Sequence, residues 1–182
     1  MVEAFKDLKN RLDLTDSYRV MLGTVPMVLM PRWFFVAIKK QVEGLAGQVV
    51  AKKVYYEAGY IGATLWARTH IKEAGISGRA VMEQYLGSAT LRGWGRFEIV
   101  NFETGKGTGL FRLYHSAVAE ETGRSPDVVC DHLPGSLAGA FQTILDHENI
   151  NLKVTGREIK CASNNHPWCE FIVEPEGMAA RD

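Results

Sequence analysis

The sequence predicts an α+β protein in which an antiparallel sheet of about four to five strands packs against a layer of about four helices. In the first half of the chain, apolar residues recur at helical spacing, whereas from residue 94 onward they largely alternate with polar ones. Helices followed by an antiparallel meander indicate a layered α+β fold. The length of 182 residues fits one domain with an added arm.

The N-terminal region divides into an arm and the start of the domain. Residues 1–16 are expected to form a helical arm, because Phe5, Leu8 and Leu12 fall on one helical face. The domain itself is expected over residues 17–176, followed by a frayed tail at 177–182.

The domain is expected to begin with β structure. Residues 17–29 are rich in β-forming residues, and Gly23 and Pro26 mark a turn or bulge within them. Pro31 suits the first turn of a helix that follows and runs to Gly44.

Three further helices are predicted from apolar periodicity, at about 49–73, 78–90 and 133–146. The first should carry one apolar set inward: Val50, Val54, Tyr55, Ala58, Ile61, Leu65 and Trp66. Glycines on the helices are interpreted as small residues that permit close packing or leave room for a ligand: Gly59, Gly62, Gly135 and Gly139.

Two strand pairs complete the prediction. Apolar and polar residues alternate within 94–102 and within 110–116, and these two segments flank a glycine-rich hairpin loop. Residues 150–159 and 168–174 flank a polar turn and form the second pair.

Charge and composition exclude several classes. The 21 Lys and Arg residues balance 21 Asp and Glu residues, so we expect no nucleic-acid partner and no anionic membrane surface. Pro26, Pro31 and Arg32 interrupt the most apolar stretch, which argues against a membrane span. Three cysteines, an odd number, with no secretion signal favour a reducing cytoplasmic compartment.

The strongest local pattern is Glu158-x-x-Cys161 followed by Cys169, together with Cys130. Thiolates prefer zinc in a tetrahedral shell, and an all-protein shell makes the metal structural. Glu158 and Cys161 would face opposite ways on a regular strand, so a bulge is required. Three free buried cysteines are an equally good interpretation of this spacing. His132 and His166 are rival fourth ligands that the spacing does not separate.

Aromatic residues of the predicted hairpin and helices suggest a pocket for a small apolar ligand. The candidates are Trp94, Phe97, Phe111 and Tyr114 on the hairpin and Tyr55 and Trp66 on the helices, with His115 as a polar contact. Taken singly, each aromatic residue is better explained as core. No complete catalytic motif is present, so we expect a binding protein more than an enzyme.

Four passages carry a family resemblance: YYEAGYIGATLW (55–66), GWGRFEIVNFETGKGTGLFRLYHS (93–116), CDHLPGSLAGAF (130–141) and EIKCASNNHPWCEFIVEP (158–175). Over about residues 17–175 the chain resembles the 4-vinyl-reductase domain family, which includes small hydrocarbon-binding proteins and the aromatic-sensing domains of bacterial activators.

The resemblance implies a structural zinc ion on Cys130, Glu158, Cys161 and Cys169, although Asp131-His132 departs from the aromatic residue typical after the first cysteine. It also implies that Tyr114 lies where the sensors place a strand aromatic.

We therefore expect a zinc-stabilised cytoplasmic sensor or carrier for a small hydrophobic or aromatic molecule. An assembly protein related in fold to trafficking-particle (TRAPP) subunits is the alternative, and an enzyme acting on a tetrapyrrole vinyl group is a weaker one. A homodimer is expected, with the helix faces around Trp33 and Tyr85 as candidate interfaces.

Overall fold

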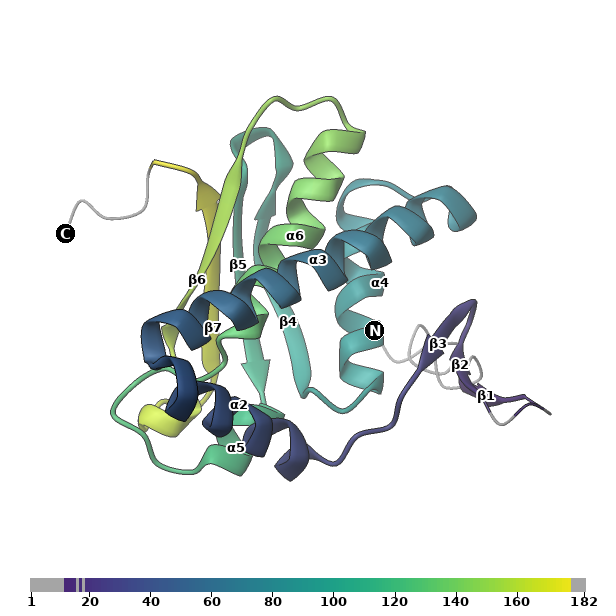
Figure 1. The fold of residues 1–182 in the computed structure, drawn as a ribbon. Coiled ribbons are helices and arrows are strands. Elements are labelled where there is room, and N and C mark those ends of the chain that lie inside the picture. The colour runs from purple at the N-terminus through teal and green to yellow at the C-terminus, as the bar shows by residue number, and fades with distance from the viewer. Residues whose placement is uncertain (1–11, 16, 18, 178–182) are drawn as a thin grey trace.

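The structure, a computed structural model, describes residues 12–15, 17 and 19–177 and has the α+β fold expected (Figure 1). Its helices are α2 (Arg32–Ala46), α3 (Gln48–Ala74), α4 (Gly78–Leu91), α5 (Ala117–Thr122) and α6 (His132–His147). The four long helices match the predicted ones within a few residues, whereas the short α5 was not predicted.

Four antiparallel strands form the main sheet, in the order β4-β5-β7-β6. They are β4 (Arg96–Glu103), β5 (Thr108–Tyr114), β6 (Val154–Lys160) and β7 (Cys169–Pro175). Both predicted strand pairs are present, and β5 pairs with β7 to join them. A 3-10 turn at Thr104–Lys106 connects β4 to β5, and another at Ala162–Asn164 lies between β6 and β7.

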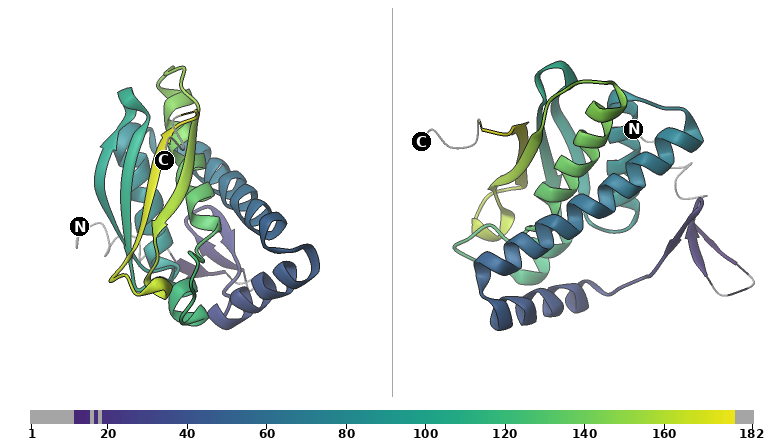
Figure 2. Two further views of the ribbon diagram at one scale, coloured as in Figure 1. Left: turned by 90° about the vertical axis from the view of Figure 1, so that its left-hand side faces the viewer. Right: turned by 45° about the horizontal axis from the view of Figure 1, so that its top comes forward.

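The helices cover one face of this sheet, as the side view in Figure 2 shows. Helix α6 lies against β6 and β7, and α4 lies against β4. Helix α3 crosses α6 on its far side, and α2 packs against α3 and α5. The molecule is therefore layered from the sheet, through α6 and α4, to α3 and α2.

The core lies between α6 and the inner face of the sheet. Residues 133–145 of α6 are all buried, and Phe111, Phe141 and Phe171 are fully buried. Burial alternates along β5, so Arg112 and Tyr114 lie on the outer face, which none of the described helices covers.

Helices α3 and α6 approach closely because glycines lie at their crossing. A Cβ atom on Gly135 would lie 1.9 Å from the Tyr56 carbonyl oxygen, and one on Gly139 would lie 2.3 Å from that of Tyr60. A Cβ atom on Gly59 would lie 2.1 Å from the His132 carbonyl oxygen. These three glycines permit backbone contact and do not leave space for a ligand. Only Gly62 of the four faces open space.

The N-terminal prediction needs correction where the structure describes it. Leu12–Leu14 form strand β1, not the end of a helix, and pair with β2 (Val20–Leu22), which pairs with β3 (Val25–Met27). The expected β structure and turn are confirmed, with Gly23 in the left-handed region at φ 61°. Residues 1–11 of the proposed arm and 178–182 of the tail lie outside the described residues.

Helix α3 does not bury the apolar set expected of it. Tyr55 is buried, but Val50, Val54, Ile61 and Leu65 are between 48% and 60% exposed. The buried residues of α3 include the small residues Ala51, Ala63 and Ala67, and Gly59 lies at its crossing with α6. Tyr85, a candidate interface residue, is buried, whereas Trp33 is exposed.

Among the helices that the structure describes, none is both long and apolar enough to cross a membrane.

Candidate functional site

The three cysteines and Glu158 meet at one end of the sheet. Cys130 lies two residues before the start of α6, Glu158 lies on β6, Cys161 follows β6, and Cys169 begins β7. One ligand atom from each residue lies within 4.8 Å of the others, and we call this group the cysteine cluster. The structure thus brings together the four residues that the sequence analysis singled out.

A β-bulge lets two of these residues face the same point. The pairing of β6 with β7 shifts register between Glu158 and Lys160, as the spacing required. Without this shift, strand alternation would direct Glu158 and Cys161 to opposite faces.

The sulfur atoms of the cluster are close but not bonded. The Cys169 Sγ atom lies 3.7 Å from both the Cys130 and the Cys161 Sγ atoms, and all three cysteines are free and buried. Two thiolates on one tetrahedral zinc ion, each at about 2.3 Å, lie about 3.8 Å apart. The sulfur positions therefore suit a zinc ion.

Neighbouring hydroxyl and amide groups support the sulfurs. The Ser163 hydroxyl lies 3.0 Å from Cys161 Sγ, and the Ser116 hydroxyl lies 3.2 Å from Cys130 Sγ. The Ala162 amide donates to Cys169 Sγ at 3.3 Å. Such donors favour the thiolate form that a metal requires.

The carboxyl group of Glu158 is only partly satisfied by the protein. Its Oε2 atom accepts a hydrogen bond of 2.8 Å from the Cys130 amide, but its buried Oε1 atom has no hydrogen-bond partner among the described residues. Burial raises the pKa of Glu158 to about 9, and the neighbouring Cys161 and Cys169 side chains, together with burial, raise the pKa of Cys130 well above its usual range. A cation at the centre of the cluster would offset the free-energy cost of ionising these buried side chains, so the donor set fits a divalent metal.

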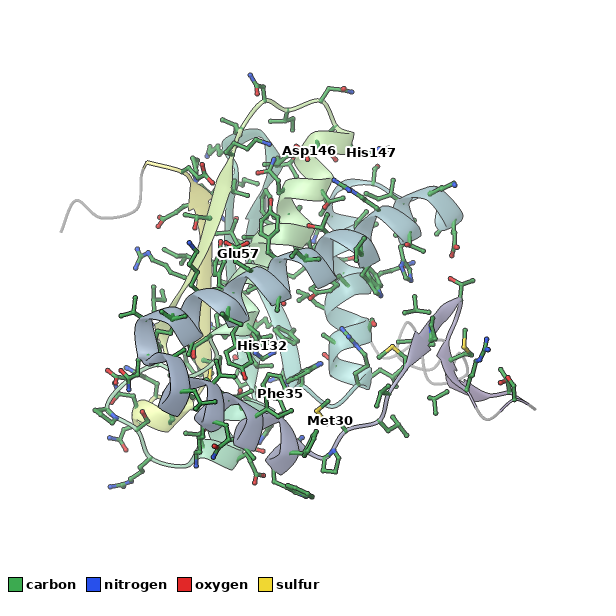
Figure 3. All side chains as sticks on the ribbon, in the orientation of Figure 1. Met30, Phe35, Glu57, His132, Asp146 and His147 are labelled. Atoms are coloured by element: carbon green, nitrogen blue, oxygen red, sulfur yellow. The ribbon has the colours of Figure 1, made fainter. Side chains whose placement is uncertain are left out.

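The two rival histidines do not join the cluster. His166 is exposed in the turn between β6 and β7, and the cluster does not include it. His132 lies two residues after Cys130, but its ring packs between Phe35 and Trp94, with centroid distances of 5.2 and 4.5 Å (Figure 3).

A cavity of about 420 Å³ lies between α3, α4, α6, the start of β4 and the small N-terminal sheet, and we call it the central cavity. Three of the predicted ligand-binding aromatics line it: Trp66, Trp94 and Phe97. Ligand sites are typically about 300–1,000 Å³ and mostly apolar. The central cavity therefore has the size and lining of a small-molecule site.

The other four predicted binding residues do not line the central cavity. Phe111 is fully buried in the core, and Tyr55 packs against Phe35 at 5.9 Å between centroids. Tyr114 lies on the outer face of the sheet, where its hydroxyl donates to Glu98 at 2.8 Å. The exposed His115 side chain contacts Glu120 at 3.2 Å. These four residues therefore lie outside the wall of the central cavity, and strand alternation turns Tyr114 away from the helices.

Two polar residues of the central cavity were not predicted as binding residues. Ser88 of α4 and His132 of α6 line it, and their Oγ and Nε2 atoms are buried without a hydrogen-bond partner among the described residues. Burial, with the nearby charges of Arg92 and Lys39, lowers the pKa of His132 to about 3. The helical spacing of Ser88 from Val81 and Tyr85 indicates that it lies on the buried face of α4. Nothing in the sequence indicates that its hydroxyl lacks a hydrogen-bond partner.

A second hollow, of about 610 Å³, adjoins the central cavity along residues 27–36. It shares Leu22, Met27, Arg92 and Trp94 with the central cavity. Its wall includes Val28 and Leu29, which are largely exposed, so this groove is open to solvent.

The sequence matches a family described as a domain of unknown function (DUF5943) over residues 11–100. A search of curated proteins finds no significant match.

Several solved structures share the fold. The phenol-responsive sensory domain of the transcription activator PoxR, solved with phenol, has 20% identity and a TM-score of 0.80, covering 96% of this chain and 90% of that chain. A vinyl-4-reductase family protein from Methanocaldococcus jannaschii has 16% identity and a TM-score of 0.53, with coverage of 96% and 91%.

A trafficking protein particle complex subunit 3 from Naegleria fowleri, covalently bound to palmitic acid, has 10% identity and a TM-score of 0.54, covering 80% of this chain and 95% of that chain. At these identities the likeness establishes the fold, which agrees with the fold of the family that the sequence resembles.

Proposed function

We propose that the protein is a binding module, a sensor or carrier, for a small hydrophobic or aromatic molecule that occupies the central cavity. The observation that carries this proposal is an apolar cavity of about 420 Å³ faced by Trp66, Trp94 and Phe97. Aromatic rings offer a large apolar contact area, and a concave apolar site removes much of the ligand's surface from water. A fold shared with a phenol-responsive sensory domain supports the same function.

Binding is testable through the intrinsic fluorescence of the cavity tryptophans. Titration with toluene, ethylbenzene and a medium-chain alkane is expected to give a saturable change in emission, because Trp66 and Trp94 line the cavity. Trp66→Phe removes one reporter and should reduce the signal. If neither a hydrocarbon of this panel nor benzyl alcohol gives a saturable change or raises the melting temperature, the proposal is wrong.

We further propose that the cysteine cluster holds a structural zinc ion through Cys130, Glu158, Cys161 and Cys169. Bound zinc would join the start of α6 to β6 and β7, the elements from which these ligands come. With four protein ligands the site has no open position for catalysis, which favours binding over an enzymatic function. Three reduced thiols suit a cytoplasmic location.

Elemental analysis of the purified chain is expected to give one zinc per protomer. Cys169→Ser should lose it, and His166→Ala should retain it, because His166 is exposed and outside the cluster. Equal zinc contents in the two variants would contradict the ligand assignment.

A second candidate function, assembly through protein contacts, is favoured by one observation. Helices α2 and α3 expose large apolar side chains at Trp33, Phe34, Ile38, Leu45, Val49, Val50, Val54, Ile61 and Leu65. Extended apolar surfaces of this kind mark interaction sites. We propose that a second copy of the chain covers this face, because symmetric homodimers are the commonest assembly.

Size-exclusion chromatography with light scattering would test the homodimer. The double substitution V54K/I61K is expected to give monomers, and the control Glu83→Lys on α4 is expected to leave dimers intact. A wild-type monomer at all concentrations would contradict this interface.

A further inference from the structure

Two unpartnered polar atoms point to the chemical class of the ligand. Ser88 is 1% exposed, and both its Oγ atom and the Nε2 atom of His132 are buried without a hydrogen-bond partner among the described residues. Both residues line the central cavity. A buried polar atom without a partner costs free energy, so native structures almost always satisfy such atoms.

Other polar residues of the central cavity are already engaged within the protein. The Thr69 hydroxyl donates to the Leu65 carbonyl oxygen at 3.0 Å, and the Ser136 hydroxyl donates to that of His132 at 2.9 Å. Arg92 Nε donates to the Ser88 carbonyl oxygen at 3.3 Å. Among the described residues that line the central cavity, the buried side-chain atoms without a hydrogen-bond partner therefore belong to Ser88 and His132.

Both side chains are held in place. Phe35 and Trp94 contact the His132 ring, and the Ser136 hydroxyl binds the His132 backbone. Ser88 lies within α4, between buried Leu86 and Ala89. Fixed donors and acceptors favour one orientation of a bound group.

Resting on the proposed function, we propose that the central cavity selects a neutral molecule with an apolar body and a hydroxyl group, which His132 and Ser88 bind. A hydroxyl both donates and accepts, so one group can serve an imidazole nitrogen and a serine hydroxyl. The apolar body contacts Trp66 and Phe97. A charged group would leave water for a mostly apolar wall in which Arg92 is the one charged side chain among the described lining residues, and such burial is costly.

The test compares matched ligands on the full-length, zinc-supplemented protein. Benzyl alcohol and ethylbenzene differ by a hydroxyl in place of a methyl group, and phenylacetate adds a charge. We expect the wild type to bind benzyl alcohol at least about tenfold more tightly than ethylbenzene, and to bind phenylacetate more weakly than either.

Two variants locate the preference. His132→Phe keeps an aromatic ring and Ser88→Ala keeps the helix, and each should weaken benzyl alcohol binding about tenfold while ethylbenzene binding is retained. If His132→Phe does not fold, Ser88→Ala alone decides. The control Thr143→Val, whose buried hydroxyl binds the Gly139 carbonyl oxygen outside the cavity, should keep the preference.

The outcomes separate this inference from the proposed function. Binding of ethylbenzene as tight as that of benzyl alcohol would overturn the inference and leave the proposed function standing. Preference for phenylacetate would overturn it in favour of an anion at Arg92. A preference unchanged in both variants would also overturn it, and no binding of any ligand would overturn both proposals.

Discussion

The cysteine cluster and the central cavity are built in different ways, although both adjoin the start of α6. Three of the four cluster residues lie within twelve residues along the chain, and one bulge and one turn bring them together. The central cavity draws its wall from β2, β3, α3, α4, β4 and α6. The residues of the cysteine cluster can therefore be predicted from their spacing in the sequence. The residues of the central cavity cannot, because they depend on how several helices and strands pack together.

Residues 130–132 connect the two regions. Cys130 belongs to the cluster, and His132 lines the central cavity. Between them, Asp131 forms an ion pair of 2.9 Å with Lys39 of α2, and Lys39 also bonds Glu43. A substitution at any of these three residues therefore tests whether zinc binding by the cysteine cluster and ligand binding by the central cavity depend on each other.

The largest expected effect is loss of the cluster. Cys161→Ser or chelation of zinc should remove the proposed link between α6, β6 and β7. If free zinc exceeds the Kd by about 1,000-fold, its removal costs about 4 kcal/mol, which lowers the melting temperature by roughly 8–16 °C in a chain of this size. Calorimetry with and without chelator measures it. An unchanged melting temperature would show that the cluster does not support the fold through a metal.

The next effect is expected at the ion pair beside the cluster. Lys39 and the Asp131 side chain are 7% exposed, so Lys39→Met leaves a buried carboxylate without its partner. We expect a loss of about 3 kcal/mol in urea unfolding. The neighbouring Lys40 is exposed, and Lys40→Met should change stability by less than about 0.5 kcal/mol. Similar losses in both variants would argue against a special role for this pair.

A smaller effect separates two glycines on the same helix. Gly59→Ala would bring its Cβ atom within 2.1 Å of the His132 carbonyl oxygen and should cost about 1–3 kcal/mol. Gly62→Ala meets nothing within 4 Å and should gain up to about 1 kcal/mol from helix propensity. Because Gly62 lines the central cavity, its variant should also bind the largest ligands more weakly. Equal stability of the two variants would contradict the close crossing.

The smallest expected effect concerns affinity alone. Phe97→Leu removes an aromatic ring from the cavity wall and should weaken binding of an aromatic ligand by about 1 kcal/mol, or roughly fivefold. Tyr114→Phe should not change affinity, because its hydroxyl binds Glu98 on the outer face. A fluorescence titration compares them. Weakened binding only in Tyr114→Phe would restore the original assignment of that residue.

The sequence was sufficient for the parts of the fold that depend on periodicity. Helices α2, α3, α4 and α6 and both strand pairs follow their apolar patterns, and the bulge near Glu158 follows from spacing alone. The burial of α3 could not be predicted in this way. Helix α3 packs on α6 through the face where small residues allow backbone contact. Because Val54 and Ile61 do not lie on that face, they remain exposed.

The same distinction explains the cavity residues. Trp66, Trp94 and Phe97, three of the predicted binding residues, line the cavity. Alternation places Tyr114 opposite Phe111 on β5, but it does not tell which of these two faces the helices cover. The sequence analysis gives His132 as a rival metal ligand and does not place it in the cavity. Its packing against Phe35 and Trp94 depends on the position of α2, which no short-range pattern indicates.

The most direct test of the whole account is native mass spectrometry of the purified protein with a hydrocarbon added. The account predicts one zinc per chain together with a saturable mass increase of one hydrocarbon per chain. A chain that carries neither metal nor hydrocarbon, at hydrocarbon concentrations up to the solubility limit, would contradict it.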